Sequence, residues 1–181
     1  MTLLVFLGCA HLVDISVTGA AIAPTMANQA AWDGPDSMPA GAGGLLQRMA
    51  AAVDPDGSLP RAAGDAASVK AKPDPFGTVT LVSTGERNGE QSMLTLATED
   101  TLAPDWTAAP ATFTNVTLDA DVRLRVALID KDMVTDDPIG TVEVPNSELL
   151  KAMRAGAPLE VDVSTQSSGQ LLKLRVQVEK R

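Results

Sequence analysis

The chain has 181 residues, a formal net charge of −9 at pH 7 and a pI of about 4.5, and its length suits one domain with a single core. So acidic a chain argues against nucleic acid, whose affinity comes from Lys and Arg neutralising phosphates, and against a polybasic membrane patch. One cysteine excludes an internal disulfide, and one cysteine with one histidine cannot make a structural zinc site.

The N-terminal stretch MTLLVFLGCAHLV contains an apolar run at residues 3–7, which is too short to span a bilayer. Because Gly8 and Cys9 follow it, the run resembles the end of a bacterial lipoprotein signal, in which the cysteine is lipidated. This interpretation makes residues 1–11 a leader and places the protein at the bacterial cell envelope, anchored through Cys9. The alternative is that residues 3–7 form a first strand, that Cys9 is a small buried residue, and that the protein is cytoplasmic.

Eight segments of the body show the period-two alternation of apolar and polar residues that predicts half-buried strands. The pattern is clearest in the last segment, where Leu and Val alternate with Lys, Arg, Gln and Glu. The predicted strands are residues 15–22, 76–83, 93–97, 112–116, 122–128, 139–144, 159–163 and 172–179. Turn residues separate them, and one helix is predicted at residues 147–155. Many short strands with one helix predict an all-β antiparallel sandwich.

The stretch 34–72 does not fit the sandwich, because it is rich in Ala, Gly, Pro and Asp and contains no predicted strand. A connection this long is typical of a functional loop or a disordered segment, and a short helix is predicted at residues 45–53. Its glycines do not make a phosphate-binding loop, since no Gly-Lys-Ser or Gly-Lys-Thr follows them.

Four aspartates, Asp130, Asp132, Asp136 and Asp137, lie within eight residues between two predicted strands. Strand alternation points Asp130 and Asp132 the same way. Two like charges about 4 Å apart repel by roughly 4 kcal/mol at an effective dielectric constant near 20, so the cluster is unfavourable unless it holds a cation. Several flexible carboxylates suit Ca²⁺, which takes about 6 to 8 oxygen ligands. The EF-hand is excluded, because its spacing would need a glycine at Thr135.

Three stretches, KPDPFGTVTLV, TEDTLAPDW and VRLRVALIDKDMVTDDPIG, resemble successive signatures of the C2 domain, a calcium- and lipid-binding β-sandwich family. The resemblance covers about residues 12–180 and is strongest over residues 72–144. It implies an eight-stranded antiparallel sandwich, in agreement with the strand count. The expected organisation is a C2-like domain at residues 12–181, with the stretch 34–72 as a partly disordered or helical insertion in the first calcium loop.

The resemblance implies which residues bind calcium. Carried over position by position, the ligands fall on Asp74 in the first loop and on Asp130, Asp132 and Asp137 in the third. The first-loop partner of Asp74 is expected at Asp33, in the sequence AAWDGPD, because the predicted strand 15–22 comes directly before it.

Asp14 is the alternative partner, if residues 3–7 form that first strand. The chain also departs from the family at Phe76 and Ala103, where Tyr and Asn are usual, and its third loop is one residue shorter. These departures affect calcium affinity more than the fold. Trp32 and Trp106 are predicted to be core or loop anchors rather than ligand platforms.

The function implied is that of a non-catalytic calcium-binding module. It would dock on anionic phospholipid membrane, or on a partner protein, when Ca²⁺ fills the aspartate-lined loops, with Met133 and Val134 as the membrane-contacting side chains. The alternative is a structural or adhesive envelope sandwich whose calcium site is degenerate or purely structural. An enzyme is not expected, because no Gly-x-Ser-x-Gly motif is present and the one histidine, His11, lies in or beside the leader.

Overall fold

The chain forms eight strands and one helix in the computed structural model, which describes residues 11–26, 32, 72–83, 91–95, 97–132, 136–166 and 169–181. The strands are β1 (His11–Ile22), β2 (Pro75–Val82), β3 (Gln91–Leu94), β4 (Ala111–Leu118), β5 (Arg123–Asp130), β6 (Asp137–Val144), β7 (Leu159–Asp162) and β8 (Leu171–Lys180), and the helix is α3 (Asn146–Ala155). The helix of the described part lacks the length and the apolar run that crossing a bilayer requires.

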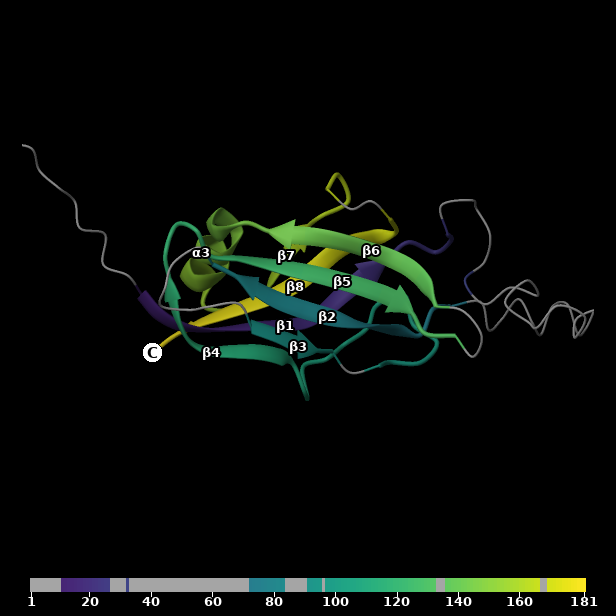
Figure 1. Cartoon of the computed structure of the whole chain (residues 1–181), viewed down its shortest axis with the longest axis horizontal. Helices are drawn as coiled ribbons and strands as arrows, with labels where there is room; N and C mark the ends of the chain where they lie inside the picture. The colour runs from purple at the N-terminus through teal and green to yellow at the C-terminus, as the bar shows by residue number, and fades with distance from the viewer. Residues whose placement is uncertain are drawn as a thin grey trace, which may run out of the picture.

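The strands make two four-stranded sheets that pack against each other (Figure 1). One sheet has the order β4-β1-β8-β7 and the other β3-β2-β5-β6. Every paired neighbour is antiparallel. The predicted eight-stranded antiparallel sandwich is therefore confirmed.

Most strand boundaries lie within two residues of the prediction, and two differ by more. β1 begins at His11 instead of residue 15, because residues 11–13 still pair with β4, from His11 opposite Leu118 to Val13 opposite Val116. β3 ends at Leu94 instead of residue 97, and just beyond its end the main-chain N–H and the hydroxyl of Thr95 both donate to the carbonyl of Gly77, at 2.7 and 2.8 Å. The apolar run 3–7 and the predicted helix 45–53 lie outside the described residues.

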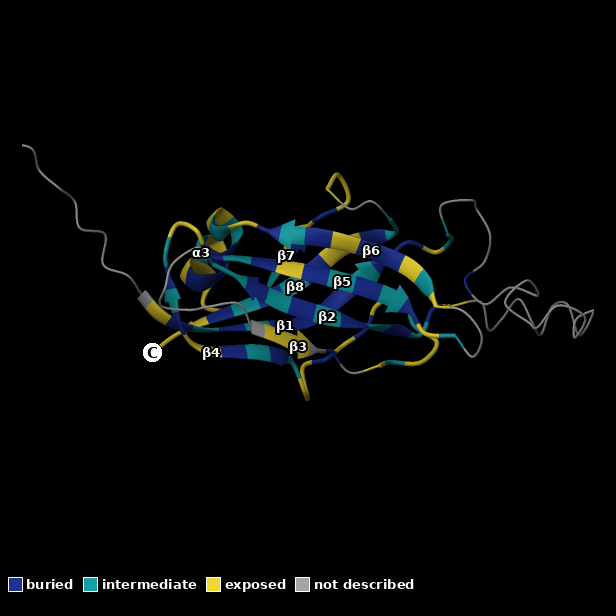
Figure 2. Ribbon diagram, in the orientation of Figure 1, coloured by how far each residue is buried: buried dark blue, intermediate teal, exposed yellow. Residues whose placement is uncertain are grey.

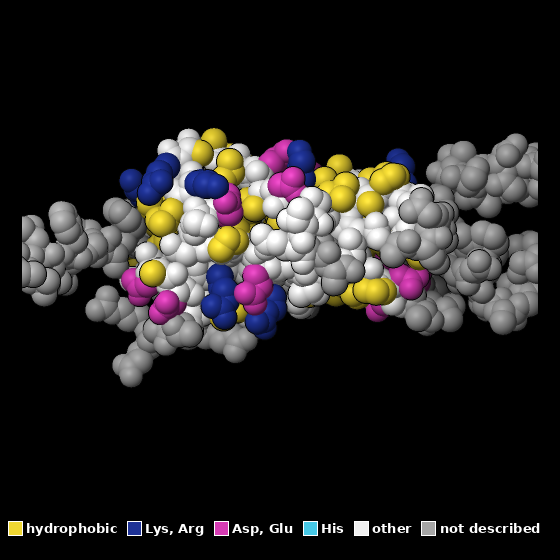
Figure 3. Space-filling view, turned by 90° about the horizontal axis from the view of Figure 1, so that it is seen from above, with side chains coloured by type: hydrophobic (Ala, Val, Ile, Leu, Met, Phe, Trp, Pro, Cys, Tyr) yellow, Lys and Arg dark blue, Asp and Glu magenta, His cyan; other side chains and the backbone are white. Residues whose placement is uncertain are grey.

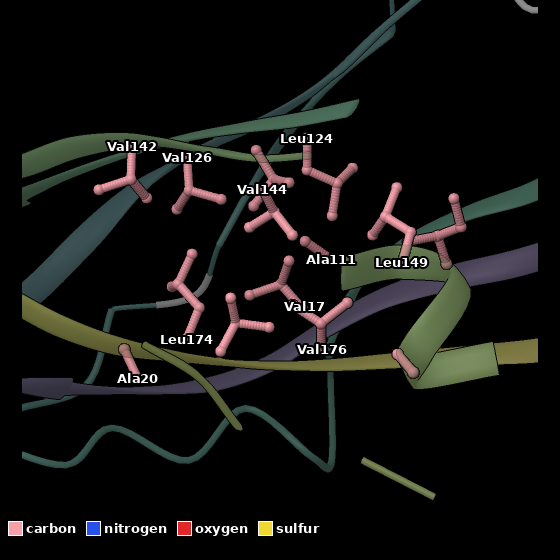
Figure 4. Packing of buried hydrophobic residues seen from close by; sticks show 14 of the residues in the cluster. Val17, Ala20, Ala111, Leu124, Val126, Val142, Val144, Leu149, Leu174 and Val176 are labelled. Atoms are coloured by element: carbon pink, nitrogen blue, oxygen red, sulfur yellow. The ribbon is translucent and has the colours of Figure 1, made fainter. Parts of the chain in front are cut away.

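The core lies between the two sheets. Along β5, every second residue is buried, as the alternating bands of Figure 2 show. Figure 4 shows side chains of the β2-β5-β6 sheet facing those of the β1-β8 sheet, with Leu149 of α3 beside them. The buried residues labelled there include Leu124, Val126, Val142 and Val144 from one sheet and Val17, Leu174 and Val176 from the other. Each such Val or Leu contributes about 1.5 to 3 kcal/mol when fully buried, so this packing is the main source of stability.

The outer faces carry cross-strand ion pairs. Arg125 Nη2 lies 2.9 Å from Glu143 Oε1, and Lys173 Nζ lies 3.0 Å from Glu160 Oε2. Figure 3 shows the same arrangement on one face, where basic side chains stand beside acidic ones. Exposed pairs of this kind contribute less than about 1 kcal/mol each, so they assist the sandwich without determining it.

Gly77 of β2 marks a position where two strands approach too closely for any side chain. A Cβ placed there would lie 2.0 Å from the carbonyl oxygen of Ala127 and 2.8 Å from Leu128 Cδ2. Gly77→Ala is therefore expected to lower the free energy of unfolding by about 3 kcal/mol or more, since strand β5 must move away. Urea unfolding followed by circular dichroism measures the change.

The matched control is Gly156→Ala at the end of α3. Gly156 has a left-handed φ of 63° but no atom within 4 Å of its Cβ position, so the same substitution costs only the backbone strain of about 1 to 2 kcal/mol. Equal losses at the two sites would contradict the close approach of β2 and β5.

Candidate functional site

Strand register brings four aspartates to one end of the sandwich. Pro75 of β2 pairs with Asp130 of β5, and Asp130 pairs with Asp137 of β6. Asp74 directly precedes β2, and Asp132 lies two residues beyond the end of β5. We call this end, defined by Asp74, Asp130, Asp132 and Asp137, the acidic end; in Figure 1 it lies where the arrow of β5 terminates. These are four of the five calcium ligands expected from the sequence.

Asp130 is a carboxylate in a core position. It continues the inward-facing row of Leu124, Val126 and Leu128, and its side chain is 0% exposed. Its Oδ1 accepts a hydrogen bond of 2.6 Å from the main-chain N–H of Asp74, whereas its buried Oδ2 has no hydrogen-bond partner. Leaving a buried acceptor unsatisfied is unfavourable, so this oxygen is a position that a proton or a cation can fill.

The surroundings of Asp130 also act on its protonation. The pKa of Asp130 is raised from 3.8 to about 6, chiefly by burial; the negative charges of Asp132, Asp74 and Asp137 contribute to the rise, and the hydrogen bond from Asp74 opposes it. The four carboxylates are therefore close enough to destabilise the charge at Asp130. Both protonation and cation binding would relieve that repulsion.

Asp74 is held by main-chain groups of two other segments. Its Oδ1 accepts a hydrogen bond of 2.7 Å from the N–H of Asp100, and its carbonyl accepts one of 3.1 Å from the N–H of Lys131. Because the main-chain N–H of Asp74 also donates to Asp130, both the N–H and the carbonyl of Asp74 are hydrogen-bonded to residues at the end of β5. The sequence did not point to Asp100, because almost any residue type can donate a main-chain N–H.

Within the described ranges, no group of three or more His, Cys, Asp or Glu side chains is placed so that it could hold a metal ion. The charges nevertheless act on Asp130 from three neighbouring carboxylates. The carboxylates are thus close enough for their charges to interact, but these side chains do not form a complete coordination sphere. The donor atoms are carboxylate oxygens, which hard cations prefer, and the unsatisfied Oδ2 of Asp130 fits such an ion.

The remaining predicted site residues lie outside the described residues: Asp33, Met133, Val134 and Cys9. They stay predictions. Trp32, directly before Asp33, is described: it is 1% exposed, and its Nε1 donates to the carbonyl of Ala23 at 2.9 Å. Ala23 immediately follows β1, so the chain is anchored there at residue 32, as expected for this tryptophan.

Asp14, the alternative ligand, does not reach the acidic end, and that alternative is wrong. Asp14 lies near the start of β1, which Figure 1 places at the opposite end of the molecule from the arrow of β5. Its Oδ2 is 2.7 Å from Arg181 Nη2, and its Oδ1 accepts from the N–H of Asn115 at 3.0 Å. Hydrogen bonds from Arg181 and then Asn115 lower the pKa of Asp14, so its charge is already compensated.

No protein-family model and no curated protein matches the sequence. The solved structures similar to the chain include C2 domains. The first C2 domain of plant extended synaptotagmin 1 has 14% identity and a TM-score of 0.49, over 95% of this chain and 95% of that chain. The paired C2 domains, A and B, of extended synaptotagmin 2 have 15% identity and a TM-score of 0.48, over 93% of this chain and 41% of that chain.

A calcium-bound structure of the same two domains of extended synaptotagmin 2 has 18% identity and a TM-score of 0.47, over 93% of this chain and 45% of that chain. The chain thus spans less than half the length of the two-domain structures and nearly all of the single domain. At these identities the likeness concerns the fold, and the ligand has to be argued from the residues of this chain.

The raised pKa of Asp130 predicts how stability depends on pH. The value is about 6 in the folded chain against 3.8 as the ordinary value, so protonation of Asp130 favours folding below about pH 4, and this contribution is lost as the pH rises through 6. In the presence of a chelator, we expect the free energy of unfolding of the wild type, relative to Asp130→Asn, to fall by roughly 2 to 2.5 kcal/mol between about pH 4 and pH 7.5. Urea unfolding at both pH values measures this.

Comparison with Asp130→Asn removes contributions that the two proteins share. Hydrogen bonds from Arg181, Thr107 and Ser164 lower the pKa values of Asp14, Asp105 and Asp162, respectively. These three carboxylates contribute stability that is lost as the pH falls, and they do so in the wild type and in the variant alike. A difference between wild type and variant that does not change with pH would contradict the strained charge at Asp130.

Proposed function

We propose that the chain is a non-catalytic C2-like module that binds Ca²⁺ at its acidic end and docks there on anionic membrane lipid. The observation that carries the proposal is the fully buried Asp130 carboxylate, whose Oδ2 has no hydrogen-bond partner. Asp74, Asp132 and Asp137 add negative charge around it. An arrangement that is unfavourable in the empty protein becomes favourable when a divalent cation is supplied.

The net charge of −9 makes docking depend on the cation. Four aspartates at one end repel an anionic headgroup, and among the residues described there they outnumber the cationic side chain beside them, Lys131, whose Nζ lies 5.3 Å from the centre of the Phe76 ring. Bound calcium supplies the positive charge that a headgroup can complete, so calcium acts as an electrostatic switch. A protein partner with an acidic surface is the other occupant that the same chemistry allows.

Absence of catalysis and anchoring at the envelope are further parts of this proposal, and both are supported by the sequence. His11, the one histidine, begins β1 at the end remote from the acidic end. Lipidation at Cys9 would keep the module at a membrane surface, where a weak calcium-dependent contact is sufficient. Mass spectrometry of the protein from a bacterial membrane fraction tests for the lipid.

Calcium is expected to raise the melting temperature of the protein at pH 7.5. A ligand at 100 times its Kd stabilises by about 2.7 kcal/mol, which corresponds to roughly 5 to 11 °C for a domain of this size. The titration should extend to about 10 mM, since extracellular modules bind with Kd values near 10⁻⁴ to 10⁻³ M. Asp132→Asn should remove most of the shift.

Asp14→Asn is the matched control, because it makes the same chemical change at the opposite end of the sandwich. It should leave the calcium shift intact. No shift in the wild type at any concentration would favour the structural or adhesive sandwich, with a degenerate site, over the calcium module.

Docking is expected to require calcium, anionic lipid and the third loop together. Vesicles containing phosphatidylserine should sediment the protein with calcium and not with chelator, and neutral vesicles should not. Changing Met133 and Val134 to Ser should abolish sedimentation, because each side chain contributes about 1.5 to 3 kcal/mol when buried. Leu12→Ser, an exposed leucine at the remote end, is the control.

Sedimentation that is equal with calcium and with chelator would contradict the switch. A calcium shift in melting temperature without any sedimentation would direct the search to a protein partner.

A further inference from the structure

The segment 98–106 fastens the first loop on both sides of Asp74. The N–H of Thr98 donates to the carbonyl of Pro75 at 3.3 Å, and the N–H of Thr101 donates to the carbonyl of Pro73 at 3.0 Å. Between these two contacts, the N–H of Asp100 donates to Asp74 Oδ1 at 2.7 Å. Three main-chain donors of one short segment therefore hold three consecutive residues.

The other half of the segment is fixed to the opposite sheet. The N–H of Trp106 donates to the carbonyl of Thr18 in β1 at 2.8 Å, and Ile22 donates to the carbonyl of Leu102 at 2.8 Å. Trp106 is 3% exposed, and its Nε1 donates to Thr98 Oγ1 at 3.0 Å. The indole thus connects the part of the segment that lies on β1 with the part that holds Asp74.

Asp100 adopts a backbone conformation that side chains rarely take. Its φ is 49°, in the left-handed region that Asn and Asp tolerate and β-branched residues avoid. The side chain is exposed, so packing does not require this conformation. Main-chain hydrogen bonds of Thr98 and Thr101 hold the chain on either side of it, and in this conformation the Asp100 N–H donates to the Asp74 carboxylate.

We propose that the segment 98–106 is a positioning element for the acidic end, in which the main-chain N–H of Asp100 orients the Asp74 carboxylate before a cation arrives. The inference rests on the proposed calcium site. A carboxylate that is already oriented loses less side-chain entropy on binding. Groups that orient ligands in this way typically change metal affinity when they are altered.

Two variants of Asp100 separate the backbone effect from the charge effect. Asp100→Asn and Asp100→Val both remove one exposed charge, but only Asn tolerates a positive φ. Calcium Kd values, measured by calorimetry well below the melting temperature, should differ from wild type by no more than about twofold in Asp100→Asn. In Asp100→Val, the Kd should rise by about tenfold. A segment that served only stability would lower the melting temperature of Asp100→Val and leave its Kd equal to that of Asp100→Asn.

A second measurement needs no calcium. In chelator, the Asp100 amide should be protected from hydrogen exchange in the wild type and unprotected in Asp74→Ala, because the acceptor is then missing. Equal Kd values for the Asn and Val variants, or an unprotected Asp100 amide, would overturn the positioning role. A protected amide in a wild type that binds no calcium would overturn the calcium site, and the positioning role with it.

Discussion

The hydrogen-bond register of β5 between β2 and β6 is the constraint on which both the core and the acidic end depend. It places Leu124, Val126 and Leu128 between the sheets, and the same alternation carries Asp130 to the last inward position. A slip of one residue would turn all four side chains to the opposite face. The close approach at Gly77 opposes such a slip, because neither neighbouring residue of β2 lacks a Cβ. Packing and site geometry are therefore determined by one set of strand pairings.

At the acidic end, the arrangement of carboxylates that suits the proposed cation is unfavourable for the stability of the fold. Apolar side chains would suit the position of Asp130, whereas the carboxylate there is buried, incompletely hydrogen-bonded and surrounded by like charge. The cost is confined to the end of the sheet, and the rows behind it remain apolar. Functional sites commonly retain such unfavourable local arrangements, which the rest of the fold compensates. The proposed calcium site would account for a carboxylate at this position, which folding alone does not favour.

Much of the fold could be predicted, because half-buried strands alternate apolar and polar residues along the sequence. The buried rows of β5 and β8 and the inward position of Asp130 follow from alternation, and the helix α3 lies within one residue of its predicted range. What could not be predicted depends on pairing between distant residues or on main-chain groups. The contact of Asp14 with Arg181 spans the whole chain, and the amide of Asp100 is independent of its side chain. The burial of Trp106 was expected, but its hydrogen bond to Thr98 was not.

The two buried tryptophans give the protein an intrinsic optical signal of its own loops. Because the chain contains no tyrosine, Trp32 and Trp106 dominate its ultraviolet emission. The indole N–H of Trp106 is bonded to the segment that holds Asp74, and that of Trp32 is bonded to the residue after β1. Indole emission responds to hydrogen bonding and solvent, so each ring reports on a different attachment of the same end of the sandwich. Replacing one tryptophan by phenylalanine would leave a single fluorophore, and the two attachments could then be followed separately without any added label.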